Sequence, residues 1–264
     1  MTQVFDLTRG HSPLIISMPH SGEELGAYAG RMTADALKIA DTDWHLPKLY
    51  SFLADMDATV VHAHYSRYVI DLNRDPSGKS LYPGQNVTEL CPTTTFDEHP
   101  VYLPGEAPHD AEQRDRVGHF WKPYHNALAA EIERVRHIHG YALLWDAHSI
   151  RSHVPRFFDG QLPDFNLGTN DGQSCSSELA EAVYGVAQQA EGYSAVLNGR
   201  FKGGFITRKY GQPGHGVHAI QLELSQITYM DESFPFTYLP ERAGEVAKPI
   251  QAMLEAMLSW KPKG

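Results

Sequence analysis

The segment 141–145 is apolar at every position and follows a glycine, Gly140. A short run without a polar face is typical of a strand buried on both faces, as in the parallel sheets of α/β proteins. In such sheets, ligands bind just beyond the carboxyl ends of the strands. Asp146 and His148 follow the run directly, so we expect both side chains at that edge of a sheet.

His148 is a candidate metal ligand at this edge. Neutral imidazole is a common ligand, and a nearby carboxylate can hold the proton of its second nitrogen and so fix the tautomer. Asp146 would be that carboxylate, placed behind the ligand. The alternative is that His148 only satisfies the backbone at the end of its strand.

A second apolar run, at 13–18, ends next to His20. Glu23 stands three residues further on and completes His-x-x-Glu, a spacing at which two ligands can meet one cation across a turn. The motif is short and common. Two strands that each end at a histidine nevertheless favour a shared metal site.

The sequence Asp-Thr-Asp-Trp at 41–44 predicts the start of an amphipathic helix that runs to about Met56. Asp43 would then lie in the first turn of this helix. Capping of the helix is one role for such an aspartate. Coordination of a metal is the other, if the helix starts against the edge of the sheet.

After a predicted strand at 58–63, the segment 65–74 alternates polar and apolar residues, which predicts a strand with one polar face. Arg67, Asn73 and Arg74 on that face suggest a carboxylate-binding site, because guanidinium matches a carboxylate bidentately. An ordinary salt-bridged edge is the alternative.

Glu223 lies within an otherwise apolar strand at 216–224. Burial of an unpaired carboxylate is costly, so we expect Glu223 to face a functional site. The glycine-rich segment 198–211 offers Arg208 as a further anion-binding residue. Arg151 is a weaker candidate for substrate binding, because it follows the turn at His148 and bracing of the next loop is an alternative role.

A chain of 264 residues with 42% hydrophobic content is long enough for one α/β domain over 1–264. We expect a mixed, mostly parallel sheet flanked by helices, with helices at 110–139, 176–190 and 243–260. Two long segments rich in turn residues, 75–108 and 155–172, are predicted to be active-site loops.

The balance of 32 acidic against 22 basic residues gives a formal net charge of -10, which argues against nucleic acid or an anionic membrane as the main partner. A local arginine cluster still allows a small acidic substrate. The sequence has neither a membrane-length apolar segment nor a secretory signal, so we expect a cytoplasmic enzyme. Cys91 and Cys175 cannot form a disulfide framework or a zinc ribbon.

These motifs strongly resemble those of the N-formylglutamate deformylase (N-formylglutamate amidohydrolase) family of histidine degradation, over nearly the whole chain. The resemblance rests on Pro19-His20-Ser21-Gly22, Asp41-Thr42-Asp43-Trp44-His45, the segment 66–74, Leu81-Tyr82, the segment 146–152, the segment 198–204 and Gln221-Leu222-Glu223-Leu224. That family is distantly similar to zinc carboxypeptidases and aminoacylases, which implies a phosphorylase/hydrolase-like α/β fold.

The resemblance implies that His20 and His148 bind one divalent metal, most simply Zn²⁺. It implies Glu223 as the general base, with Arg67, Asn73 and Arg74 as the carboxylate clamp. The carboxypeptidase pattern would make Glu23 the third ligand. We prefer Asp43, because the acidic ligand of that layout opens the helix after the first strand, and here this helix is predicted to begin at Asp43, after an insertion at 24–40.

The implied activity is hydrolysis of N-formyl-L-glutamate to formate and L-glutamate by metal-activated water. One alternative is the same chemistry on another N-acyl amino acid, or a carboxypeptidase-like hydrolase. A binding protein for acidic amino acids is the non-enzymatic alternative. Such a protein would keep the arginines but has no need of Glu223 beside two histidines.

Overall fold

The computed structural model describes residues 3–79 and 87–262, which form an α/β fold around one mixed sheet. Within these residues the sheet has seven strands in the order β1-β3-β2-β4-β7-β5-β6. The strands are β1 Phe5–Thr8, β2 Leu14–Met18, β3 Thr59–Ala63, β4 Ala142–Ile150, β5 Phe165–Gly168, β6 Ala195–Leu197 and β7 Val217–Ser225. The central strands β3, β2, β4 and β7 are parallel, whereas β1 and β5 run antiparallel to β3 and β7. The predicted fold class is therefore confirmed.

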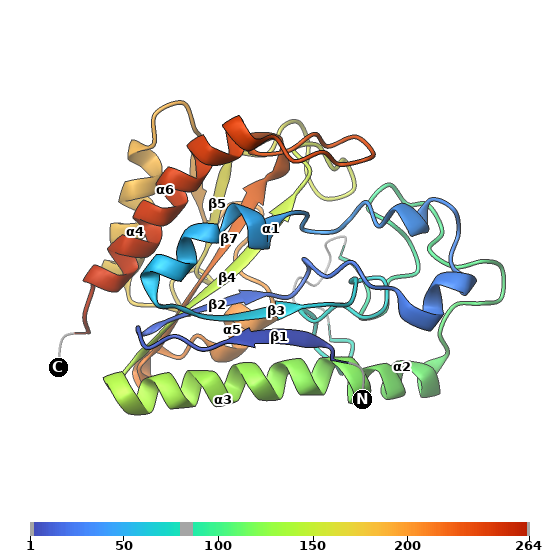
Figure 1. Ribbon diagram of the computed structural model, residues 1–264, viewed down its shortest axis with the longest axis horizontal. Helices are drawn as coiled ribbons and strands as arrows, with labels where there is room; N and C mark the ends of the chain where they lie inside the picture. The colour runs from blue at the N-terminus through green and yellow to red at the C-terminus, as the bar shows by residue number, and fades with distance from the viewer. Residues whose placement is uncertain (1–2, 80–86, 263–264) are drawn as a thin grey trace.

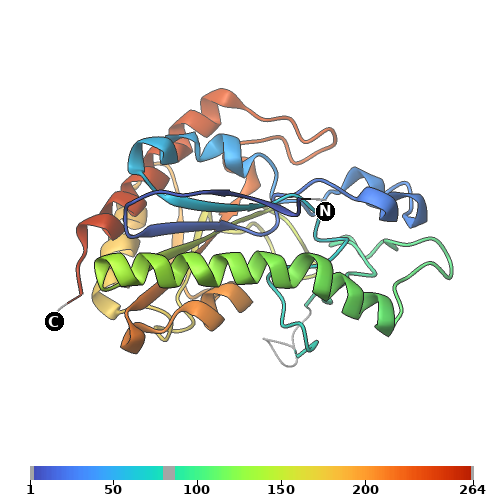
Figure 2. The same ribbon diagram turned by 60° about the horizontal axis from the view of Figure 1, so that its bottom comes forward.

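Helices cover both faces of the sheet (Figure 1). The α-helices are α1 Leu46–Leu49, α2 Asp110–Arg116, α3 Lys122–His139, α4 Ser177–Gln189, α5 Phe205–Tyr210 and α6 Pro240–Ser259. Short 3-10 helices occur at Gly26–Arg31, Ala36–Lys38, Ser51–Met56, Pro213–His215 and Gln226–Thr228, and a π-helix at Val117–Trp121 joins α2 to α3. Helix α3 lies along one face of the sheet, and α4 and α6 lie on the other (Figure 2).

Alternate residues of the central strands supply two separate cores. In β2, Leu14 and Ile16 pack in the core beneath α4 and α6, while Ile15 packs in the core beneath α3. In β4, Leu143 and Leu144 divide between the two cores in the same way. Every residue of β2 and β4 is buried, as their unbroken apolar runs predicted.

The three long predicted helices are confirmed, but the helix predicted from residue 41 is wrong in its start. Helix α1 begins only at Leu46, and the chain reaches Met56 through a separate 3-10 helix. His45 precedes α1 with φ 61°, a left-handed conformation that a right-handed helix does not accommodate. Asp43 therefore lies before the helix rather than in its first turn, and no side chain caps α1.

The strand predicted at 65–74 is also wrong, since this segment consists of turns apart from an isolated bridge between Tyr65 and Glu24. Both sides of β3 are already paired, with β1 and with β2, so no neighbouring position in the sheet is open. Loop and helix residues satisfy the backbone instead: Arg116 Nη1 donates to the Val69 carbonyl at 2.7 Å. The alternation of polar and apolar residues reflects burial between packed segments, not a pleat.

Strand β4 continues through Asp146 and His148 to Ile150, so these residues belong to the strand and do not follow it, contrary to the prediction. The segment 155–172, predicted to be a loop, contains β5. The loop predicted at 75–108 includes residues 80–86, and with them the Leu81-Tyr82 motif, which lie outside the described residues. Among the described helices, none combines the length and apolarity needed to span a bilayer.

Candidate active site

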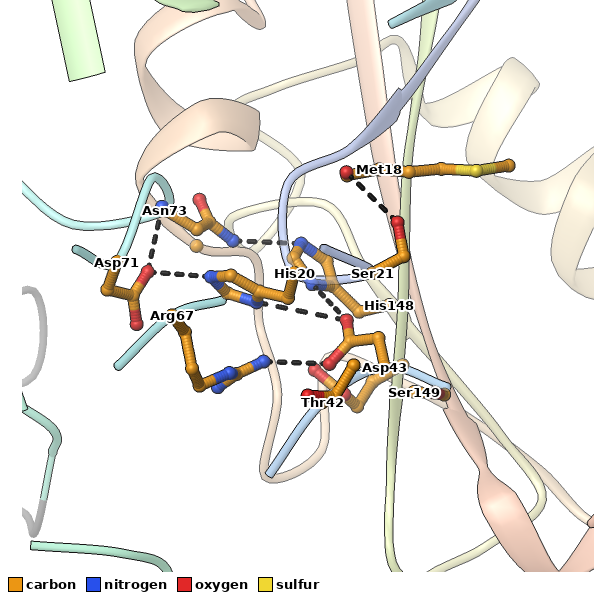
Figure 3. Close-up of polar contacts among 12 residues, drawn as sticks. Met18, His20, Ser21, Thr42, Asp43, Arg67, Asp71, Asn73, His148 and Ser149 are labelled. Carbon is orange, nitrogen blue, oxygen red and sulfur yellow. Dashed lines mark hydrogen bonds and ion pairs between the residues drawn. The ribbon is translucent and has the colours of Figure 1, made fainter. Parts of the chain in front are cut away.

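His20, Asp43 and His148 converge at the carboxyl edge of the sheet (Figure 3). Each offers one ligand atom, and these atoms lie within 4.8 Å of one another. All three side chains are buried. The arrangement follows from the sheet: β2 and β4 are neighbours, so the chain leaving β2 carries His20 alongside the end of β4.

The His20 ring is oriented by Asp71. Its Nε2 lies 2.6 Å from Asp71 Oδ1, a carboxylate that accepts the Nε2 proton. Nδ1 lies 3.8 Å from Asp43 Oδ2 and has no hydrogen-bond partner among the described residues. Burial, and next the Arg67 guanidinium, lowers the pKa of His20 to about 4. The ring is therefore neutral near pH 7, with the lone pair of a buried, unsatisfied Nδ1 directed at the cluster.

The His148 ring has a carboxylate on each side. Nδ1 lies 3.0 Å from Asp43 Oδ2, and Nε2 lies 3.2 Å from Asp146 Oδ1. Asn73 Nδ2 is 2.9 Å from Nε2. Burial alone would lower the pKa of His148, but the carboxylates of Asp146 and Asp43 outweigh it and raise that pKa well above its usual value. These neighbours fix the plane of the ring: Asp43 can accept the proton at Nδ1, whereas Nε2 faces the Asn73 amide and lies within ion-pair distance of Asp146.

Asp43 joins the two histidines to an arginine. Its Oδ1 accepts a hydrogen bond from Arg67 Nη2 at 2.7 Å, while Oδ2 faces both imidazoles. Burial alone would raise the pKa of Asp43, but the Arg67 guanidinium and His148 hold it below its usual value. Asp43 is thus an anion at neutral pH, and its Oδ2 lies between the two histidines.

Glu223 stands on β7 directly opposite His148 on β4 in the sheet register. Its Oε2 accepts a hydrogen bond from Gln221 Nε2 at 3.3 Å. Burial is the main cause that raises the pKa of Glu223 to about 8, although His148 and Arg67 pull it down. An acid so close to its protonation midpoint near neutral pH is suited to accept and release a proton.

These residues border one cavity. Its described lining residues are His20, Arg67, Asn73, Arg74, Val87, Phe96, His148, Ser149, Ile150, Phe157, Arg200, Phe201, Gly204, Gln221 and Glu223. The cavity thus brings together both predicted histidine ligands, the predicted base and the predicted carboxylate clamp. Asp43 and Asp146 lie behind the lining, in contact with His148.

Three further residues suggested by the sequence are not among the described residues that line the cavity. Glu23 is exposed to solvent. Arg151 forms an ion pair with Asp97 at 2.9 Å, in the preceding segment 75–108 and not in the loop that follows it. Arg208 on α5 donates from Nε to the Gly203 carbonyl at 2.8 Å.

The sequence analysis assigned no role to Asp71, Gln221 and Arg200. Asp71 lies in the segment 65–74, where the predicted strand gave no reason to pair it with His20. Gln221 could have been found, because it lies two residues before Glu223 on a strand and therefore on the same face. Arg200 lies among the glycines of the segment 198–211, and only its position in the folded chain reveals it.

The π-helix at Val117–Trp121 helps to hold the arginine-bearing segment. The Trp121 ring stacks on His125 with centroids 3.7 Å apart. Trp121 Nε1 donates to the Arg74 carbonyl at 3.1 Å, and His125 Nε2 lies 2.8 Å from the Leu72 carbonyl. The two rings therefore fix the backbone on both sides of Asn73, whose amide contacts His148.

An α/β sheet that carries two oriented histidines, a shared carboxylate and a separate buried acid at one arginine-lined cavity defines a hydrolase with a candidate cation site. The sequence model of the family described as N-formylglutamate amidohydrolase matches residues 12–230. The chain therefore belongs to the N-formylglutamate amidohydrolase family, and the predicted resemblance is confirmed.

Curated relatives agree with this membership. The chain is 52% identical to N-formylglutamate deformylase of Pseudomonas aeruginosa over 261 residues, and this aligned region covers 98% of each chain. It is 51% identical over 261 residues to the N-formylglutamate deformylase of Pseudomonas putida, covering 98% of this chain and 97% of the relative.

Two solved structures share the fold. The crystal structure of an N-formylglutamate amidohydrolase from Ralstonia eutropha JMP134 superposes with a TM-score of 0.79 at 24% identity, covering 96% of this chain and 97% of the other. A gene product from Agrobacterium tumefaciens superposes with a TM-score of 0.73 at 18% identity, covering 98% and 96%. At these identities the comparison concerns the fold alone.

Proposed function

We propose that the protein hydrolyses N-formyl-L-glutamate to formate and L-glutamate, a late step of histidine degradation. The observation that carries this proposal is the pairing of Glu223 with His148 across β7 and β4, inside a cavity that also holds His20 and arginines. The identity of the substrate is inferred from the two N-formylglutamate deformylases, with which the chain shares about half its residues.

The ligands proposed for one divalent metal are Nδ1 of His20, Nδ1 of His148 and Oδ2 of Asp43. The orphaned Nδ1 of buried His20 and the anionic Asp43 fit such a cation. Three N and O ligands with an open position favour Zn²⁺. When bound, this cation would lower the pKa of a water molecule and polarise the formyl carbonyl. Asp71 and Asp146 would hold the outer nitrogens of the two rings.

Glu223 is proposed to accept the proton of the attacking water. The water oxygen adds to the formyl carbon, the carbon–nitrogen bond breaks, and Glu223 returns the proton to the leaving nitrogen. Its raised pKa suits the second transfer, because a carboxyl that holds a proton near neutral pH can donate it. A nearby dication would lower that pKa and favour the first transfer.

Arg67 and Arg74, with Asn73, are proposed to bind the carboxylate next to the amide nitrogen. Arg67 is held by Asp43 and lies over the Phe96 ring at 5.1 Å, with its Nε unsatisfied among the described residues. Arg74 is held by three hydrogen bonds, two of them to Thr88. Both guanidinium groups are therefore oriented before a substrate arrives, which limits the entropy lost on binding.

Formate release from a panel of N-acyl amino acids and short peptides tests this function. We expect the highest kcat/KM with N-formyl-L-glutamate, loss of activity after chelation and recovery when Zn²⁺ is returned. Preference for another acyl group would favour a different deacylase, and cleavage of peptides a carboxypeptidase-like enzyme. Binding of acidic amino acids with no turnover would favour the binding protein. The cytoplasmic location stays a prediction.

A further inference from the structure

We infer that Arg200 binds the side-chain carboxylate of the substrate and sets the preference for acidic over neutral N-formyl amino acids. This inference rests on the proposed function. It assigns a role to an arginine that the sequence analysis did not select, and it divides the cavity into a reaction end and a specificity end.

Arg67 and Arg74 belong to the reaction end of the cavity. Arg67 donates to Asp43 at 2.7 Å. Arg74 Nη1 lies 3.7 Å from Oδ2 of Asp71, the residue whose other oxygen holds His20. Each of these arginines thus contacts a carboxylate that also touches a histidine of the cluster.

Arg200 reaches the cavity from the segment that follows β6 and rests on a different set of residues. Its Nε donates to the Phe157 carbonyl at 2.6 Å. Its guanidinium lies 5.9 Å from the centre of the Phe157 ring and 5.4 Å from that of Phe201. Both rings pack against a small apolar cluster that is separate from the two cores of the sheet. Arg200 therefore marks the wall formed by this cluster, which adjoins the reaction end at Phe96, the ring beneath Arg67.

The segment that carries Arg200 is fixed to the site at Gly204. The Gly204 N–H donates to Gln221 Oε1 at 2.7 Å. A Cβ at Gly204 would lie 2.3 Å from Asn73 Nδ2, so only glycine allows this close approach. The position of Arg200 relative to Asn73 and Gln221 is therefore set by packing.

The charges of the cavity wall suit a substrate with two carboxylates. Among the described lining residues there are three arginines, Arg67, Arg74 and Arg200, and one acid, Glu223. A single carboxylate beside the amide needs only the arginines of the reaction end. An arginine oriented by its Nε and by aromatic rings is suited to a second carboxylate at the other end, because its planar fork is already positioned.

Substitution of Arg200 by methionine, assayed on two substrates, tests the inference. N-formyl-L-glutamine keeps the formyl group and the first carboxylate but has a neutral amide in place of the second. We expect Arg200→Met to lower kcat/KM for N-formyl-L-glutamate by about 10- to 100-fold, the usual worth of a charge-assisted hydrogen bond. For N-formyl-L-glutamine the change should stay within about threefold, so the preference for glutamate disappears.

Two controls make the result specific. Lys202→Met removes a neighbouring cation that pairs with Asp171 at 3.0 Å instead of lining the cavity, and it should keep the preference for glutamate. Arg74→Met should lower kcat/KM for both substrates by a similar factor, because both substrates carry the first carboxylate. If Arg200→Met does not fold by circular dichroism, Arg200→Gln supplies the same comparison.

An equal loss on both substrates in a folded Arg200 variant would overturn the inference, and so would an unchanged preference. The proposed function fails in a different way, namely when the wild-type protein loaded with Zn²⁺ releases no formate from N-formyl-L-glutamate. The two failures are therefore distinguishable.

Discussion

His148 on β4 and Glu223 on β7 are directly opposed in a parallel pair of strands. Residues so paired project to the same face of the sheet, so the proposed base stands beside a proposed metal ligand without any loop between them. Both strands are buried along their whole length, which makes their relative position rigid. The pairing therefore holds the proposed proton acceptor at a fixed position next to the proposed cation site.

Glu223→Gln should abolish proton transfer while leaving the fold and the metal in place. Glutamine is nearly isosteric and can still bond Gln221, the present partner of Glu223. We expect formate release to fall by about two orders of magnitude or more, the usual contribution of a general base. Steady-state kinetics and metal analysis on the same preparation check this. Near-normal turnover would assign the proton to another group, such as Asp146.

Asp43→Asn and Glu23→Gln should separate the two candidates for the third ligand. Asp43 is buried between the histidines, whereas Glu23 is exposed. We expect Asp43→Asn to lose bound zinc and activity, because it removes the anionic ligand and the negative charge that pairs with Arg67. Glu23→Gln should keep both. Zinc content measured by mass spectrometry distinguishes the two candidate ligands. Loss of zinc in Glu23→Gln and not in Asp43→Asn would support the His-x-x-Glu assignment.

Arg74→Lys should weaken substrate binding although the charge is kept. Arg74 uses Nε, Nη1 and Nη2 in hydrogen bonds that a single ammonium cannot reproduce. We expect kcat/KM for N-formyl-L-glutamate to fall by about 10- to 100-fold. Arg136→Lys, at an ion pair on the outer side of α3, is the matched control. Unchanged kinetics would remove Arg74 from the site.

His125 should make the protein less stable in acid. Burial lowers the pKa of His125 from 6.5 to about 4, so the unfolded chain binds its proton more readily than the folded one. Above pH 6.5 the ring is neutral in both the folded and the unfolded chain. As the pH falls from 6.5 toward 4, the unfolded chain takes up the proton first, so the free energy of unfolding decreases. The loss is on the order of 2–3 kcal/mol.

His125→Gln should therefore flatten the decline of unfolding free energy between pH 6.5 and 4. His20 contributes in the same direction, so the informative quantity is the difference between variant and wild type. His137→Gln, at an exposed position of the same helix, should leave the slope unchanged. Urea titrations at several pH values measure it, and parallel curves for His125→Gln and wild type would contradict the prediction.

Local sequence patterns predicted that the strands of the site exist, although β4 extends further than its apolar run. The unbroken apolar runs of β2 and β4 and the acid within β7 predicted buried strands, and these carry or precede His20, His148 and Glu223. Such patterns depend on whether neighbouring side chains face a core, which each strand expresses in its own residues. The long helices were predicted for the same reason.

Only the tertiary structure decided which polar groups meet. The alternation at 65–74 looked like a pleat, but the segment packs between loops because β3 had no free edge. Asp43 faces the histidines since the left-handed His45 delays α1, and this turn was not predicted from the sequence. Asp71 and Arg200 approach the cavity through contacts between residues far apart in the chain. Periodicity records the burial of a residue, whereas the direction of its side chain toward a distant partner depends on how the elements pack.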